Sequence, residues 1–223
     1  MGQLVFSVTT AALMVLMVKA GVAAAGGGDS LRRGPLPWSA VVLAALAVGG
    51  VALQLSWPGA MAALDHDPAK TGWWRVFTSV FMQNGGAFGA LWNVATLALV
   101  AVLAHRLWGG GPTLGLFLTG VLLPERLDPL LGIGDSGADG AADPRNFAGS
   151  SGATYFLAAT LAGRLLVRSG STQDRALAAA VPVLGLAMWA AQDNGHGLVA
   201  AYGFALGAVV CLALSRAPRK AAA

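Results

Sequence analysis

Residues 37–57, PWSAVVLAALAVGGVALQLSW, contain no charged side chain. A helix needs about 20 mostly apolar residues to cross the hydrocarbon core of a bilayer, so this stretch predicts a membrane-spanning helix. The whole chain agrees, because 56% of its 223 residues are hydrophobic and only 11% are charged. An average soluble domain carries about a quarter charged residues. We therefore expect an integral, multi-pass membrane protein.

The same composition excludes several other classes of protein. An apolar fraction this high excludes a disordered chain, and the single Cys211 can form no internal disulfide. The net charge of +4 is distributed over loops and marks no nucleic-acid surface. His66 and His105 are expected in loops without a second ligand nearby, so we expect neither a metal nor another cofactor.

Six further segments can form spans. Residues 113–123 are too short to cross alone, and we expect this helix to continue past Pro124. The seven predicted spans cover residues 4–25, 37–57, 88–104, 113–133, 151–167, 176–191 and 198–214. The resulting fold class is all-α, a polytopic membrane helix bundle. Its predicted parts are an extra amino-terminal transmembrane helix (1–28), a cytoplasmic linker (29–36), a six-span core (37–215) and a cytoplasmic tail (216–223).

The distribution of charge predicts the orientation, because cytoplasmic loops carry an excess of Lys and Arg. With alternating spans, nine of the fourteen basic residues fall on one side: Arg32, Arg33, Arg106, Arg164, Arg168, Arg175, Arg216, Arg219 and Lys220. Eight of the ten acids fall on the other: Asp65, Asp67, Glu125, Asp128, Asp135, Asp139, Asp143 and Asp193. We therefore expect the carboxyl terminus in the cytoplasm. The abundance of Ala, Gly and Arg favours a bacterial plasma membrane.

Ser151 and His196 each begin a predicted span on the outer side. A serine becomes nucleophilic when a base within hydrogen-bonding reach accepts its proton, and histidine suits that role near neutral pH. Small residues continue both helix faces, and Gly203-x-x-x-Gly207 is typical of closely packed membrane helices. Two such faces allow Ser151 and His196 to approach each other.

Each of these residues also has a simpler interpretation. Gly149-Ser150-Ser151-Gly152 fits a flexible linker or a helix N-cap equally well. His196 could simply be a residue at the start of a helix, in contact with water and lipid headgroups. We expect Asp193 and Asn194 to be N-caps of the last helix and not members of a catalytic triad. Asn93 is a polar residue inside a span, which suits either a functional role or a hydrogen bond to a neighbouring helix.

Taken together, these motifs resemble the rhomboid family of intramembrane serine proteases, over residues 37–215. Gly149-Ser150-Ser151-Gly152 is similar to the family's G-x-S-G motif, with Tyr155 one turn after the serine. His196 precedes glycines at seven and eleven residues, as in the family's final helix. Residues 74–79, WRVFTS, resemble the W-R motif of the first outer loop, and Asn93 matches the asparagine of the second core helix.

The resemblance implies a serine endopeptidase that cleaves transmembrane helices of membrane proteins near the outer leaflet. Ser151 would be the nucleophile and His196 its base, with Tyr155 stacked on the imidazole. Asn93 and the backbone around Ser151, with Gly149 and Ser150, would support the oxyanion. The implied partners are transmembrane protein substrates and the lipid bilayer, with no nucleic acid and no metal. Substrates would enter past residues 176–191, where Pro182 is consistent with a movable gate.

The chain also departs from the family pattern. Gly89 stands where the family often has a histidine, four residues before Asn93, and Gln83-Asn84-Gly85-Gly86 replaces a His-Gly-Gly segment. These departures favour an alternative function: a catalytically weak or inactive rhomboid-like protein that binds or escorts membrane helices. A small-solute transporter is disfavoured, because it would need ionisable groups at mid-membrane depth.

Overall fold

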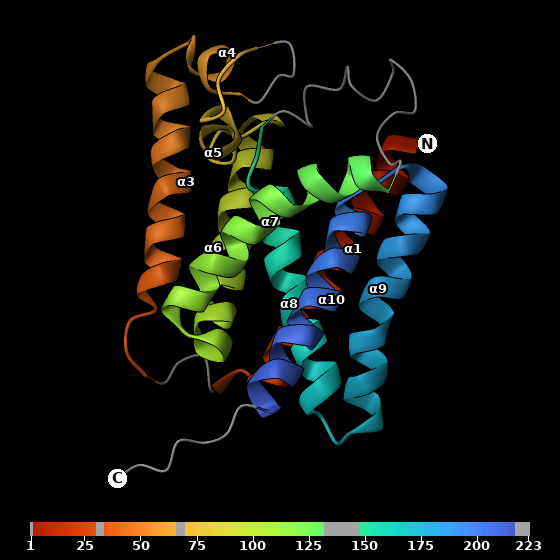
Figure 1. Cartoon of the computed structure of the whole chain (residues 1–223). Helices are drawn as coiled ribbons and strands as arrows, with labels where there is room; N and C mark the ends of the chain where they lie inside the picture. Colours follow the sequence, from red (N-terminus) through yellow and green to blue (C-terminus); the bar gives the residue numbers. More distant parts are fainter. Residues whose placement is uncertain (1, 30–33, 66–69, 132–147, 217–223) are drawn as a thin grey trace. The chain divides into compact units, whose positions relative to one another are not determined.

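The computed structural model describes residues 2–29, 34–65, 70–131 and 148–216, and within them every regular element is a helix (Figure 1). The two short helices are α4 (Ala60–Leu64) and α5 (Arg75–Ser79). The seven long helices are α1 (Gly2–Ala24), α3 (Trp38–Ser56), α6 (Gly86–Trp108), α7 (Gly110–Leu130), α8 (Ser151–Arg168), α9 (Thr172–Gln192) and α10 (Gly195–Arg216). Residues 30–33 of the predicted linker 29–36 and residues 217–223 of the predicted tail 216–223 lie outside the described residues.

Five of the described helices, α1, α3, α6, α9 and α10, are long and apolar enough to cross a membrane. This confirms the predicted all-α class and a multi-pass membrane protein. The helix predicted at residues 113–133 does continue through Pro124, as α7, but its apolar part, Gly110–Pro124, is short. The helix predicted at 151–167 is α8, which falls outside the five.

The chain forms two compact units. Residues 34–157 form one, here called the serine unit because it contains Ser151. Residues 1–33 and 158–223 form the other, here called the histidine unit because it contains His196. Helix α8 passes from the first to the second at Ala158, and the predicted six-span core remains a prediction.

In the serine unit, α3 packs beside α6 (Figure 1). The buried residues of α3 recur every three or four positions, as one helix face requires: Ser39, Ala40, Leu43, Ala47 and Gly50. The Ser39 hydroxyl lies 2.8 Å from Nδ1 of His105. The prediction of a loop at His105 is therefore wrong, because this residue lies in the last turn of α6 and ties it to α3.

In the histidine unit, α9 packs against both α1 and α10. Gly185 and Gly197 allow the backbones of α9 and α10 to meet, because the carbonyl oxygen of each occupies the place where a Cβ of the other would lie. The Thr160 carbonyl of α8 fills the corresponding place at Gly207 of α10. Backbone contacts of this kind are typical of membrane helices, whose packing depends on close van der Waals contact.

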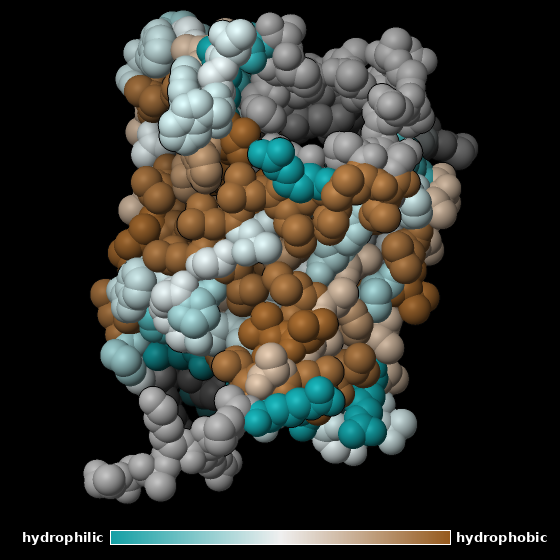
Figure 2. Space-filling view, viewed as in Figure 1, coloured by the Kyte–Doolittle hydropathy of each residue, from teal (hydrophilic) through white to brown (hydrophobic). Residues whose placement is uncertain are grey.

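Large apolar side chains face outward along the spanning helices, as Figure 2 shows for one face. Exposed examples on α3, α9 and α10 are Val41, Leu46, Val48, Val183, Leu186, Val209 and Leu212. Apolar surface on this scale marks contact with lipid or with another protein. Together with the five apolar helices, it fits an integral multi-pass membrane protein.

Candidate functional site

The glycine-serine motif leads directly into α8, whose first residue is Ser151. Gly149 has a φ of 133°, a conformation that residues with a Cβ rarely adopt, and its N–H donates to the Ser79 carbonyl at 3.0 Å. The first helical bond runs from the Thr154 N–H to the Ser150 carbonyl at 2.9 Å. The turn thus presents the Ser151 side chain at the amino end of a helix.

The Ser151 hydroxyl and the Asn93 amide converge on the backbone of Gly149. A Cβ built on Gly149 would lie 3.8 Å from Ser151 Oγ, 3.9 Å from Asn93 Nδ2 and 4.0 Å from the Met82 carbonyl oxygen. Two residues that are 58 positions apart in the sequence therefore face the same small volume. This volume exists because residue 149 has no side chain.

Gln83 links the predicted residues to one another. Its Oε1 accepts a hydrogen bond from Asn93 Nδ2 at 2.8 Å, and its Nε2 donates to the Ser150 hydroxyl at 3.4 Å. The Gln54 amide holds the backbone of Gln83, accepting from its N–H at 2.7 Å and donating to its carbonyl at 3.0 Å. Gln83 and Ser150 are buried.

Sequence analysis missed this role of Gln83, treating it only as a departure from a family motif. The signal that could have found it is Gln54, the amide in the otherwise apolar run 37–57. An amide in a membrane span needs a hydrogen-bonding partner, and Gln83 supplies it from the segment before α6.

The structure also gives a physical reason for Gly89. A Cβ at this position would lie 2.6 Å from the carbonyl oxygen of Asn84, so any larger side chain would displace the backbone. A histidine one turn before Asn93 does not fit this start of α6. Gln83, ten residues before Asn93, supplies the polar contact to Asn93 instead.

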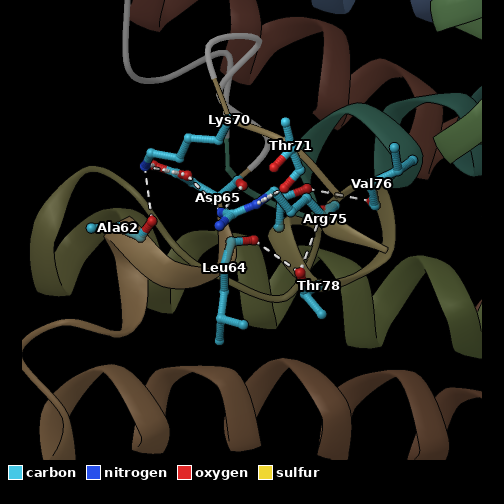
Figure 3. Close-up of polar contacts among 9 residues, drawn as sticks. Ala62, Leu64, Asp65, Lys70, Thr71, Arg75, Val76 and Thr78 are labelled. Carbon is cyan, nitrogen blue, oxygen red and sulfur yellow. Dashed lines mark hydrogen bonds and ion pairs between the residues drawn. The ribbon is translucent and has the colours of Figure 1, made fainter. Parts of the chain in front are cut away.

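The W-R segment anchors the loop that precedes these residues (Figure 3). Arg75 donates from its Nη1 to the Asp65 carbonyl at 3.0 Å and from its Nε to the Thr71 carbonyl at 3.1 Å. Lys70 donates to the Asp65 carboxylate at 2.7 Å, and the Thr78 hydroxyl donates to the Leu64 carbonyl at 2.9 Å. Arg75 therefore holds this loop through its bonds to two backbone carbonyls.

Tyr155 lies one helical turn after Ser151 and is only 2% exposed. It is followed by an almost continuously buried stretch of α8, from Phe156 to Gly163. Its predicted stacking on His196 would join the two units and remains a prediction.

His196 lies in the first turn of α10, in the histidine unit. The Oδ1 atom of Asn194 accepts the backbone N–H of His196 at 3.1 Å and lies 3.2 Å from its Nδ1. Asn194 Nδ2 donates to the Thr10 hydroxyl of α1 at 2.8 Å, and Asn194 is fully buried. The Phe6 ring, also in α1, stands edge-on to the imidazole with centroids 6.5 Å apart.

Of the two predicted N-caps, only Asn194 has that geometry. Its side chain accepts an N–H of the first turn of α10, which defines an N-cap. Asp193 ends α9 instead, in a left-handed conformation with a φ of 51°.

The remaining packing residues lie deeper along α10. Gly203 and Gly207 are both buried on the side that also carries Ala200 and Cys211. The place of a Cβ on Gly163 of α8 is filled by the Phe204 carbonyl. Small residues on both helices thus permit backbone contact in the histidine unit.

The structure gathers Asn93, Gly149, Ser150 and Ser151 in the serine unit, with Gln83 added. It gathers Asn194 and α1 around His196 in the histidine unit. The pairing of Ser151 with His196 stays a prediction. Comparisons of the chain with protein family models, with curated proteins and with solved structures return no match.

Proposed function

We propose that this protein is a rhomboid-type intramembrane serine endopeptidase that cleaves transmembrane helices near the outer leaflet. The observation that carries the proposal is the convergence of the Ser151 hydroxyl and the Asn93 amide on the side-chain-free Gly149. A nucleophile and a hydrogen-bond donor around one small volume are what acyl transfer needs.

In the proposed reaction, Ser151 Oγ bonds to the scissile carbonyl carbon while its proton passes to Nε2 of His196. The tetrahedral intermediate collapses, the C–N bond breaks, and His196 returns the proton to the leaving amine. Water then attacks the acyl-enzyme, gives one proton to His196 and releases the carboxylic acid. His196 finally reprotonates the Ser151 oxygen.

Asn194 supports this role by selecting the tautomer of His196. A backbone N–H can only donate, so the Asn194 atom that faces the His196 N–H must be its oxygen. The same oxygen faces Nδ1 at 3.2 Å, so Nδ1 carries the hydrogen. The lone pair of the neutral imidazole then lies on Nε2, which is the atom that must accept the serine proton.

Helix α1 also helps to position His196, because the Thr10 hydroxyl accepts a hydrogen bond from the Nδ2 of Asn194. The bond holds the amide with its oxygen toward the histidine. We therefore assign Asn194 and Thr10 as positioning residues. Thr10→Val should slow the acylation of Ser151 without removing it, and Thr10→Ser should restore the rate.

Asn93 suits the role of an oxyanion donor. Its Nδ2 has two hydrogens, and only one is needed for the bond to Gln83. The second is available toward the volume beside Gly149. N–H groups in the first turn of α8 are a further source of donors, because helix geometry gives them no intrahelical acceptor.

Labelling with a fluorophosphonate tests the proposal directly, because the probe reacts with activated serines. We expect labelling of the wild-type protein in membranes, none for Ser151→Ala, and a strong reduction for His196→Ala. Ser150→Ala is the matched control for the adjacent hydroxyl and should still label. A folded wild-type protein that neither labels nor cleaves a single-span substrate would refute the protease proposal.

The same experiment evaluates the alternative, an inactive rhomboid-like protein that binds or escorts membrane helices. The observation favouring it is Gly89, where the Asn84 carbonyl leaves no room for the histidine of the family pattern. A protein that never labels but is recovered in complex with single-span membrane proteins would support this alternative.

A further inference from the structure

A cavity of about 410 Å³ lies in the histidine unit, where α1 and α8 end and α9 begins. Two arginines line it, Arg164 and Arg168, together with Asp174 and the apolar side chains of Ala23 and Leu165. A volume of this size is in the usual range for small-ligand sites. Nothing in the proposed proteolysis uses it.

The two arginines lie on one face of α8, four residues apart, so both guanidinium groups reach the same side of the helix. Arg164 is partly buried, and Arg168 is exposed one turn nearer the helix end. One guanidinium therefore lies inside the cavity and the other near its opening. This arrangement suits a ligand with negatively charged oxygens that enters from the end of α8. Paired N–H donors make arginine a preferred ligand for phosphate oxygens.

Among the described residues that line the cavity, two arginines and one carboxylate give one net positive charge. That carboxylate is Asp174, which accepts the Ser169 hydroxyl at 2.9 Å. Two carbonyls in the last turn of α1, which would repel an anion, already accept hydrogen bonds. Val22 O accepts the Gly27 N–H at 3.0 Å, and Ala23 O accepts the Gly26 N–H at 3.0 Å.

Further basic residues surround the same end of this unit. Arg175 lies in the first turn of α9, Arg216 ends α10, and Lys19 is exposed on α1 one turn before Ala23. In Figure 2 hydrophilic side chains gather at the lower helix ends of this unit, below a mainly apolar surface. This is the end that the charge distribution predicts to face the cytoplasmic leaflet, where anionic lipid headgroups lie.

We infer that this cavity binds the phosphate of an anionic glycerophospholipid of the cytoplasmic leaflet. Arg164 and Arg168 bind the phosphodiester oxygens of the lipid. The single negative charge of the phosphodiester matches the net charge of the cavity. The apolar walls formed by Ala23 and Leu165 accept the first carbons of the lipid. The bound lipid would join the end of α1 to the α8–α9 turn.

Native mass spectrometry of the purified full chain tests this inference, with phosphatidylglycerol or phosphatidylcholine added to the detergent micelles. We expect preferential retention of phosphatidylglycerol. Removing one arginine should weaken its binding about fivefold, the equivalent of about 1 kcal/mol for one basic group near a lipid surface. Arg168→Gln is the main variant, because its exposed side chain can change without disturbing the helix bundle.

Arg216→Gln is the matched control, since it removes an exposed arginine at the same end that does not line the cavity. It should leave lipid retention unchanged. Arg164→Lys should retain more lipid than Arg164→Gln, because it keeps the charge. Equal retention of the two lipids, or equal effects of Arg168→Gln and Arg216→Gln, would overturn the inference.

A third arm separates a lipid from a free phosphate. Glycerol 3-phosphate and inorganic phosphate are added to lipid-depleted protein, and thermal unfolding is followed. A lipid site predicts stabilisation by phosphatidylglycerol alone. Stabilisation by the soluble phosphates to the same extent would show a general phosphate site and would contradict the lipid assignment.

Discussion

Substitution of Gln83 by alanine should slow proteolysis by withdrawing the support of Asn93. The change removes the 2.8 Å bond from Asn93 and the 3.4 Å bond to Ser150. Only the bond from Asn93 supports the proposed oxyanion donor, and its net contribution is about 1 kcal/mol. If the whole of this contribution is lost from the transition state, kcat falls about fivefold. Loss of the donor itself in Asn93→Ala should be worse, about 10²–10³-fold.

The assay is cleavage of a single-span substrate in vesicles, with initial rates measured for both single variants and for the double variant. If Gln83 acts through Asn93, the double variant should be no slower than Asn93→Ala alone, because the supported group is already missing. Gln173→Ala, at an exposed glutamine of α9, is the control and should leave the rate unchanged. Independent, multiplicative effects of the two substitutions would refute the reasoning, as would full activity of Gln83→Ala.

Three further predictions concern the backbone and the loop that Arg75 holds. Gly149→Ala should abolish cleavage and lower the free energy of unfolding by about 1–3 kcal/mol, since its φ of 133° disfavours alanine; both are measurable on one purified sample. Gly207→Ala should destabilise by about 1–3 kcal/mol in denaturant titrations, because the Thr160 carbonyl occupies the place of its Cβ. Gly115→Ala, with nothing within 4 Å, should be neutral or stabilising, and a loss equal to that of Gly207→Ala would contradict this packing. Asp65→Asn should lower stability by less than about 1 kcal/mol and leave kcat unchanged, because the Asp65 carboxylate only pairs with Lys70 and Arg75. A large fall in kcat would place the loop that Arg75 holds in the reaction.

Several structural features could be predicted because they depend only on local sequence. The run 37–57 predicted a helix and α3 covers Trp38–Ser56, since an apolar segment in a membrane must satisfy its own backbone hydrogen bonds. The helix through Pro124 follows for the same reason. His105 was misplaced because the predicted span ended at residue 104, whereas α6 continues to Trp108 and His105 contacts Ser39, 66 residues earlier.

Some residues of the candidate site could be singled out from the sequence, and others could not. Ser151, Asn93 and His196 could be singled out because polar residues are rare in apolar helices and because their spacing resembles a known family. Gln54 in the run 37–57 indicated that a polar partner was needed, but it did not identify the contacts of Gln83, which are with residues 10 and 67 positions away. No periodicity in a sequence encodes such a pairing.

The amino-acid sequence alone determined that the chain is a helical membrane protein and that Ser151 and His196 lie at the starts of two of its helices. Charge and hydropathy act over whole segments, so they can be read without knowing how the segments pack. Only the tertiary structure decided which polar groups meet: Asn93 with Gln83 at 2.8 Å, and Asn194 with Thr10 across 184 positions. A hydrogen bond needs its two atoms within about 3 Å and correctly aligned, and only helix packing fixes positions that closely.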